Sequence, residues 1–197
     1  MLTKIFLALI PIFVAVDAIG VLPIFISLTQ EFDIAEKRKI LLQSFWTAIS
    51  VAFGFILIGK GLFALLGITV GDFMVAGGLV LFCIAIIDLI IPEKTRRMPL
   101  GELGVVPLGT PLIVGPAVLT TCLIIVDQYG VLPTIISVVL NVLFAAILFY
   151  FSDRVTKVLG KSGAVALSKI MALLLASIAV MMIRKGIYLL MHIANGV

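Results

Sequence analysis

Six apolar runs, each close to the length of about 20 residues that an α-helix needs to cross the hydrocarbon core of a bilayer, constrain the fold of this chain. Apolar residues make up 63% of the chain and charged residues 12%, which is far from the composition of a soluble domain. The runs predict an all-α membrane protein with six transmembrane helices, at about residues 5–29, 41–66, 72–91, 105–126, 132–151 and 164–182.

The length of 197 residues has room for these spans and short connections, and leaves none for a separate soluble domain. We therefore expect a single transmembrane domain over residues 1–197, with the lipid bilayer as its surroundings. A net charge of +4 suits nucleic acid binding in a soluble protein, but here the bases occupy the connections between apolar runs. The charge predicts membrane orientation, and we expect no nucleic acid partner.

The basic residues lie in alternate connections. They follow the first, third and fifth runs, and the connections after the second and fourth runs hold none. Because basic connections stay in the cytoplasm, this pattern predicts a multi-pass protein with both termini outside. The residues concerned are Lys37, Arg38, Lys39, Lys94, Arg96, Arg97, Arg154, Lys157 and Lys161.

The first run contains residues that a membrane helix has little reason to hold, namely Asp17, Gly20 and Pro23. An ionised Asp at the centre of a span costs roughly 2.5 to 3.5 kcal/mol by insertion scales, and Pro lacks a backbone donor. Function is the leading explanation for tolerating this cost. We expect Asp17 to be the N-cap of a half-helix that begins near Ala18, and Gly20 and Pro23 to break the span further along.

The fourth run also contains helix-breaking residues at a density that no ordinary helix has. Two dipeptides in it, Thr110-Pro111 and Gly115-Pro116, each predict a helix start. Thr is a favourable N-cap, and Pro fits the first helical position because its missing donor would be unpaired there.

The two unusual runs correspond to each other in an internal repeat. A shift of 93 residues, without gaps, places Pro23 on Pro116 and the turn at Gly67 on Gly160. Each half has three runs, an odd number, so the two halves must enter the membrane from opposite sides. The sequence thus predicts a 3+3 inverted-topology repeat with broken helices 1 and 4, a plan of secondary transporters with a site near the bilayer midplane.

The repeat halves are residues 1–98 and 99–197. At the two breaks, half-helix N-termini with free N–H groups favour an anion such as a carboxylate, and Asp17 can pair with an ammonium group or carry a coupling proton. In the structural alternative, Asp17 only holds the break open, and the other breakers are kinks. The candidate substrate-binding residues are Asp17, Gly20, Pro23, Thr110, Pro111, Gly115, Pro116, Thr120 and Asn141.

Enzyme chemistry has little support in this sequence. No Ser-His, Cys-His or zinc-ligand spacing occurs, and His192 is the only histidine. Cys83 and Cys122 both fall inside predicted spans, where they are expected to be packing residues. Asp17 and Asp88 are predicted at different depths, too far apart to share a proton. We therefore expect no enzyme, no cofactor and no metal site.

Three stretches resemble the MarC family of bacterial and archaeal six-span membrane proteins, which includes small neutral amino-acid transporters. They are Asp-Ala-Ile-Gly-Val-Leu-Pro-Ile-Phe-Ile-Ser-Leu-Thr at 17–29, Val-Pro-Leu-Gly-Thr-Pro-Leu-Ile-Val-Gly-Pro at 106–116, and Ile-Met-Ala-Leu-Leu-Leu-Ala-Ser-Ile-Ala at 170–179. The second of these stretches is the most specific, and the resemblance covers nearly the whole chain.

The resemblance implies a proton-coupled transporter of glycine, alanine or similar zwitterionic amino acids in a prokaryotic cytoplasmic (inner) membrane. Export is one of the transport directions that it implies. Together with the repeat, it predicts alternating access by rocking of the two halves. The alternative is a channel or an exporter of other small metabolites or drugs with the same fold.

Overall fold

The computed structural model describes residues 1–29, 32–90 and 104–194, which form helices and no strand. In chain order these are α1 (Leu2–Val16), α2 (Ala18–Thr29), α3 (Ile34–Leu66), α4 (Val70–Ile90), the π-helix η2 (Gly104–Ile113), α6 (Pro116–Tyr129), α7 (Val131–Tyr150) and α8 (Ser152–Ala194). Within this part of the chain, five helical segments are long and apolar enough to cross a membrane, and α6 is a shorter apolar helix. The prediction of an all-helical membrane protein is confirmed.

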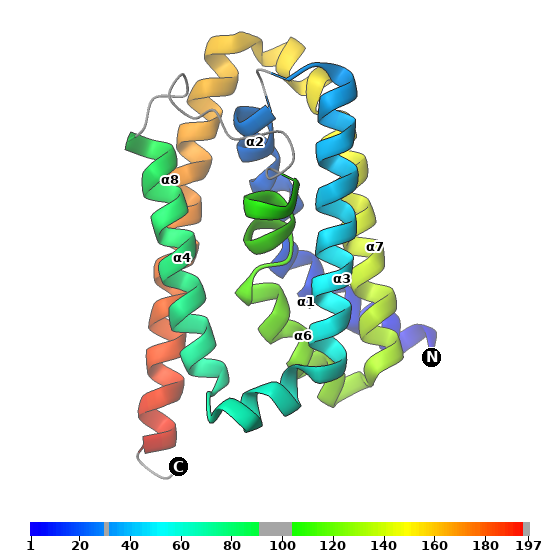
Figure 1. Ribbon diagram of the computed structural model, residues 1–197, viewed down its shortest axis with the longest axis vertical. Coiled ribbons are helices and arrows are strands. Elements are labelled where there is room, and N and C mark those ends of the chain that lie inside the picture. The colour runs from blue at the N-terminus through cyan, green and yellow to red at the C-terminus, as the bar shows by residue number, and fades with distance from the viewer. Residues whose placement is uncertain (30–31, 91–103, 195–197) are drawn as a thin grey trace.

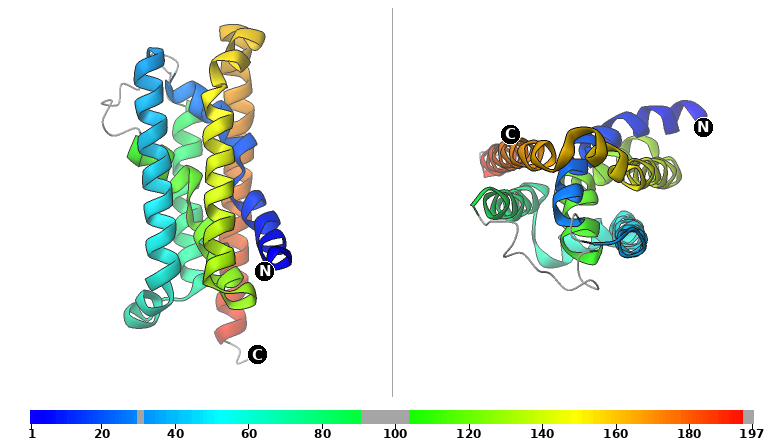
Figure 2. Two further views of the ribbon diagram at one scale, coloured as in Figure 1. Left: turned by 90° about the vertical axis from the view of Figure 1, so that its right-hand side faces the viewer. Right: turned by 90° about the horizontal axis from the view of Figure 1, so that it is seen from above.

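Two helix pairs enclose two interrupted segments (Figure 1). The α4 and α8 helices pack together on one side, and α3 and α7 pack together on the other. Between the pairs lie α2, and η2 followed by α6, whereas α1 leads to α2 from the edge of the bundle beside α7, as the view from above shows (Figure 2). The N-terminus and the end of α8 lie toward the lower end of the bundle in Figure 1, to which α6 also descends, whereas α2 rises toward the upper end.

Two helices begin earlier than the apolar runs indicate. A capping box starts α3, in which the Asp33 carboxylate accepts the Glu36 N–H at 2.7 Å and the Glu36 carboxylate accepts the Asp33 N–H at 3.0 Å. The α8 helix begins directly at Ser152, so the connection expected before residue 164 is wrong. That segment contains no proline to stop a helix, and the start of α8 crosses the upper end of the bundle in Figure 1.

Small residues bring α4 and α8 into close contact. A Cβ atom added to Gly78 would lie 2.9 Å from the Ala179 carbonyl oxygen, and one added to Gly186 would lie 2.7 Å from the Gly71 carbonyl oxygen. Backbones of membrane helices approach closely where such small residues face each other. These two contact points fix which face of α8 turns toward the middle of the bundle.

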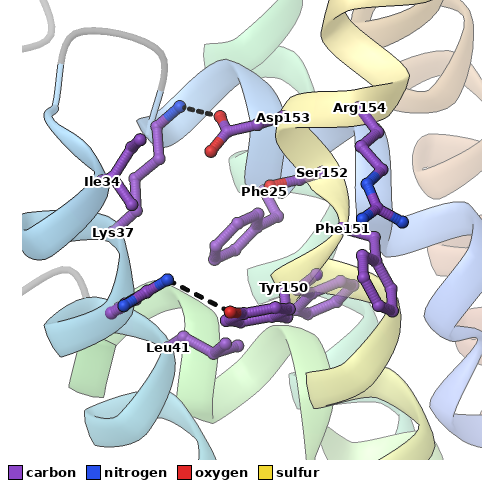
Figure 3. A pocket seen from close by; sticks show the side chains of 11 residues that line it. Phe25, Ile34, Lys37, Leu41, Tyr150, Phe151, Ser152, Asp153 and Arg154 are labelled. Atoms are coloured by element: carbon purple, nitrogen blue, oxygen red, sulfur yellow. Dashed lines mark hydrogen bonds and ion pairs between the residues drawn. The ribbon is translucent and has the colours of Figure 1, made fainter.

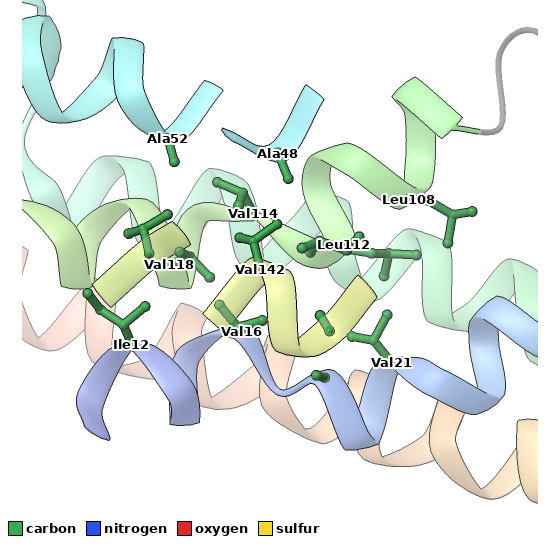
Figure 4. Close-up of a cluster of buried hydrophobic side chains, with 14 of the residues drawn as sticks. Ile12, Val16, Val21, Ala48, Ala52, Leu108, Leu112, Val114, Val118 and Val142 are labelled. Carbon is green, nitrogen blue, oxygen red and sulfur yellow. The ribbon is translucent and has the colours of Figure 1, made fainter. Parts of the chain in front are cut away.

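The interrupted segments pack against α3 and α7 through one buried apolar cluster (Figure 4). Val16, directly before the interruption of the first segment, and Val114, directly before that of the second, both belong to it. The cluster therefore holds the two interruptions near the centre of the bundle. Other members are Ile12, Val21, Ala48, Ala52, Leu108, Leu112, Val118 and Val142.

Polar side chains of α7 attach it to α1. The Ser137 hydroxyl donates to the Ile5 carbonyl at 3.1 Å, and the Asn141 amide donates to the Leu9 carbonyl at 3.2 Å and to the Ser137 carbonyl at 2.9 Å. Asn141 is buried, and polar groups of this kind join helices inside a bilayer.

Replacing Asn141 with Leu is expected to lower the stability of the purified protein by about 0.6 kcal/mol, the average measured for hydrogen bonds between membrane helices, and by no more than about 1.7 kcal/mol. The α1 carbonyl of Leu9 loses its side-chain donor, while the branched shape and the number of heavy atoms of the side chain are kept. Melting temperature in detergent is the measurement. Ser177→Ala is the matched control, because the exposed Ser177 hydroxyl donates only to Leu173 of its own helix.

Candidate functional site

Asp17 separates α1 from α2. It has φ 44° and ψ 50°, and it is the only non-glycine residue with a positive φ in the described part of the chain. This left-handed conformation costs most residues roughly 1 to 2 kcal/mol, and Asp and Asn adopt it more readily than other side chains. The left-handed backbone conformation at this position therefore favours Asp, independently of any role for its charge.

The same residue ends one helix and begins the next. The Asp17 N–H donates to the Phe13 carbonyl at 3.2 Å, and the Asp17 carbonyl accepts the Val21 N–H at 3.0 Å. The Asp17 carboxylate accepts the Gly20 N–H at 3.2 Å. This is N-cap geometry, as the sequence predicted. Gly20 permits it, because a Cβ atom there would collide with the carboxylate.

The expected further break at Gly20 and Pro23 is wrong, since α2 continues through both to Thr29. Neighbouring helices commonly support prolines inside membrane helices, and Pro23 is buried here. Because Pro23 has no N–H, the carbonyl of Ile19 lacks its usual helical donor. That carbonyl lies one turn from Pro23, in the first turn of α2, beside Asp17.

The second interruption lies between η2 and α6. Gly115, with φ −97° and ψ −177°, is the N-cap of α6, and Pro116 is its first residue, so this predicted helix start is confirmed. The start expected at Thr110-Pro111 is wrong, because both residues lie within η2. The Thr110 hydroxyl donates forward to the Val114 carbonyl at 3.0 Å, so it helps to end one helix and does not cap the next.

A pocket of about 500 Å³, which we call the Asp17 pocket, is lined by Asp17 together with residues of α1, α2, α4, α6 and α8. It touches the first turns of both α2 and α6, whose leading N–H groups have no acceptor within their own helices. Its walls are otherwise mainly apolar. The lining residues are Pro11, Phe13, Val14, Ala15, Asp17, Ala18, Ile19, Met74, Ala117, Thr120, Thr121, Ile178, Met181, Met182 and Lys185.

A second pocket of about 310 Å³, which we call the α2–α8 pocket, lies on the other side of Asp17. It is lined by Asp17, Gly20, Val21, Ile24, Leu174, Leu175, Ser177, Ile178 and Met181. Asp17 thus borders both pockets, together with Ile178 and Met181 of α8.

Three of the predicted site residues line these two pockets: Asp17 lines both, Thr120 the first and Gly20 the second. The others lie elsewhere, with Pro23, Gly115 and Pro116 buried beside the interruptions, Thr110 in η2, and Asn141 between α7 and α1. The side chains of Pro111 and Asp88 lie outside the described part of the structure.

The hydroxyl groups at the Asp17 pocket use their protons within α6. Thr120 donates to the Pro116 carbonyl at 2.9 Å, and Thr121 donates to the Ala117 carbonyl at 2.7 Å. This is a common arrangement of membrane hydroxyls. The oxygen atoms keep their acceptor capacity, so these residues can receive a hydrogen bond from a cationic group in the pocket.

Sequence reasoning missed the contribution of α8 to the Asp17 pocket, which includes Met181, Met182 and Lys185. The last predicted span, at about residues 164–182, ends before Lys185. The available signal was the helical spacing of Ile178, Met181 and Lys185, which places them on one face. That spacing could not show which neighbour this face meets.

The upper end of the bundle in Figure 1, which we call the basic end, is closed by paired side chains (Figure 3). Lys37 of α3 forms an ion pair with Asp153 of α8 at 2.6 Å. Arg38 donates to the Tyr150 hydroxyl at 3.1 Å. These residues line a pocket of about 200 Å³ whose lining also includes Phe25, Ile34, Leu41, Phe149, Phe151, Ser152 and Arg154.

An aromatic stack lies beneath this pocket. The rings of Phe25 in α2 and Phe149 in α7 are 4.8 Å apart between centroids, and each residue is 1% exposed. Phe25 directly follows Ile24, which lines the α2–α8 pocket. The stack therefore lies between the space around Asp17 and the basic end. Among the described residues, no cluster of His, Cys, Asp and Glu suits a metal ion.

Comparison with known proteins identifies the family. The model of the MarC family of integral membrane proteins matches residues 2–191. A UPF0056 membrane protein of Methanocaldococcus jannaschii is 31% identical over 194 residues, covering 90% of this chain and 84% of the relative. The UPF0056 inner membrane protein YhgN of Escherichia coli is 29% identical over 195 residues, covering 94% and 97%. No solved structure matches the chain. The chain belongs to the MarC family of integral membrane proteins.

Proposed function

We propose that this protein is a secondary transporter of small neutral amino acids that works by alternating access. The observation that carries the proposal is the Asp17 pocket, in which one carboxylate and the first turns of two half-helices border a mainly apolar space. A zwitterion needs both kinds of partner. Its carboxylate suits the free N–H groups and positive dipole ends of α2 and α6, and its ammonium group suits Asp17 and the Ile19 carbonyl.

The predicted 3+3 inverted repeat supports a transporter plan. In it, α1–α2 and η2–α6 are corresponding broken spans, α3 corresponds to α7, and α4 to α8. Several helix contacts then occur in matching pairs: α1–α7 with α3–η2, α2–α8 with α4–α6, and α2–α7 with α3–α6. The contacts α3–α7 and α4–α8 each join a helix to its own counterpart in the other half. Such a pattern is expected when two related halves are joined around an axis in the membrane plane.

The position of the pockets favours a state that is open away from the basic end. The Asp17 pocket includes none of the residues that line the pocket at that end, where the Phe25–Phe149 stack and the Lys37–Asp153 ion pair lie. Alternating access then requires these contacts to open as the halves rock. Asp17 is the group that we assign to proton coupling.

Membrane orientation follows from charge. The basic end carries Lys37, Arg38 and Arg154, so the positive-inside rule places it in the cytoplasm and both termini outside. The relative YhgN is named an inner membrane protein, which supports the same membrane for this chain.

Counterflow in proteoliposomes tests the proposal. Vesicles that contain the purified protein and unlabelled glycine or alanine should accumulate the labelled amino acid, and a proton gradient should alter the rate. Absence of counterflow with and without a gradient would contradict amino-acid transport. Flux that does not saturate would favour a channel, and activity confined to other compounds in a metabolite and drug panel would favour a different exporter.

Loss of the Lys37–Asp153 ion pair is expected to increase access from the basic end by about fivefold. A pair of this exposure, 18% and 38%, contributes up to about 1 kcal/mol to the closed state. The measurement is the maleimide labelling rate of Thr121→Cys from the basic side, after replacement of Cys83 and Cys122. Lys37→Ala should raise that labelling rate. The charge-swapped variant, Lys37→Asp combined with Asp153→Lys, should restore the rate of the protein with the native pair. Equal rates in all variants would show that the pair does not restrain opening.

A further inference from the structure

Two charged side chains of opposite sign line the Asp17 pocket. They are Asp17, between α1 and α2, and Lys185 of α8, and the other lining residues are apolar or carry a hydroxyl group. Lys185 has no ion pair recorded within the described residues. The pocket therefore presents an anionic and a cationic group to one shared, mainly apolar space.

The course of α8 directs Lys185 toward the level of Asp17. The helix runs from the basic end downward in Figure 1, and Cα–Cβ bonds tilt toward a helix N-terminus. The Lys185 side chain thus leans back toward Met181, one turn earlier. Met181 borders both pockets, as Asp17 does, so it marks the level of the carboxylate.

The packing of α8 against α4 fixes this orientation. Gly186, the neighbour of Lys185, lies against the Gly71 carbonyl and the Val75 side chain, with 2.7 Å from an added Cβ to each. Rotation of α8 about its axis would separate these surfaces. Arg184, on the other side of Lys185, does not line the Asp17 pocket. The backbone contact between α8 and α4 therefore determines that Lys185 is the cation that lines the pocket. Its neighbour Arg184 provides a control with the same charge.

We propose that Lys185 binds the carboxylate of a substrate whose ammonium group lies at Asp17, so that the site selects complete zwitterions. This inference rests on the proposed amino-acid transport. An amine without a carboxylate would be attracted by Asp17 and repelled by Lys185. A carboxylate without an amine would be attracted by Lys185 and repelled by Asp17. Only a molecule with both charges close together gains at each end, in addition to the N–H groups of α2 and α6.

Binding of glycine and of glycinamide, which lacks the carboxylate charge, tests this role. Titration calorimetry with the purified protein should show that Lys185→Gln weakens glycine binding by about tenfold, the scale of one lost charge-assisted hydrogen bond. Glycinamide should bind the wild type weakly, and its affinity for Lys185→Gln should be at least as high as its affinity for the wild type. Lys185→Arg keeps the cation and should retain most of the glycine affinity.

Arg184→Gln removes the same charge from the same helix and should leave glycine binding unchanged. Equal weakening by both Gln variants would reduce the role of Lys185 to general attraction of anions and overturn the proposal. So would equal weakening of glycine and glycinamide by Lys185→Gln, or unchanged glycine binding in that variant. Melting curves confirm that each variant is folded, and Lys185→Met repeats the test with a side chain of similar length. A wild type that binds neither glycine nor alanine would instead contradict the proposed function itself.

Discussion

Asp17→Asn is expected to reduce counterflow of glycine or alanine by at least about tenfold, while the melting temperature stays close to that of the wild type. The substitution removes the carboxylate that borders both pockets, which is the group to which we assign proton coupling. Asn adopts the left-handed conformation of residue 17 and keeps an oxygen for the Gly20 N–H. The break between α1 and α2 should therefore persist.

Two further variants separate charge from backbone structure. Asp17→Ala loses the cap and is strained at φ 44°, so it should lower both stability and transport. Asp72→Asn removes a carboxylate that caps the start of α4 by accepting the Thr69 N–H at 2.8 Å, away from both pockets. It should leave transport intact. Full activity of Asp17→Asn would show that residue 17 only shapes the break.

Gly77→Ala is expected to destabilise the protein by about 1 to 3 kcal/mol, the usual cost of overfilling a packed site. A Cβ atom at Gly77 would collide with the ring of Pro116, the first residue of α6. The contact holds α4 against the second interruption, so the strain should also affect substrate binding in the Asp17 pocket. Melting temperature and glycine affinity are the two measurements.

Gly54→Ala provides a control with the opposite expected sign. Gly54 lies within α3, and an added Cβ atom there meets nothing within 4 Å. Replacing a glycine inside a helix with alanine then stabilises the helix by up to about 1 kcal/mol. If Gly77→Ala and Gly54→Ala shift the melting temperature in the same direction, the contact between Gly77 and Pro116 has no energetic importance.

Hydrogen bonding within one helical turn accounts for the two helix starts that the sequence predicted correctly. Asp17 caps α2 and Gly115-Pro116 begins α6, because a cap depends on residues within one turn. The errors at Pro23 and Thr110 have a different origin. A proline can begin a helix or lie inside one, and the choice depends on which neighbours support the backbone. A threonine hydroxyl likewise donates to whichever carbonyl the surrounding structure brings near.

Helix starts outside the bilayer show what hydropathy leaves out. The run of apolar residues placed the second span well after Ile34, where α3 begins. The Asp33 and Glu36 pair was a readable capping box in the sequence, whereas the early start of α8 at Ser152 has no comparable marker. Hydropathy reports the part of a helix inside lipid, and a helix can continue beyond it.

The sequence by itself determined that this chain forms apolar membrane helices and that residues 17 and 115–116 interrupt two segments. Both properties follow from local causes, the length of apolar runs and the hydrogen bonding of caps and prolines. Only the tertiary structure decided which side chains share the Asp17 pocket. Lys185 lies far along the chain from Asp17, and the packing of α8 against α4 brings them to one space. Composition and periodicity describe one helix at a time, and a site built from five helices depends on how they cross.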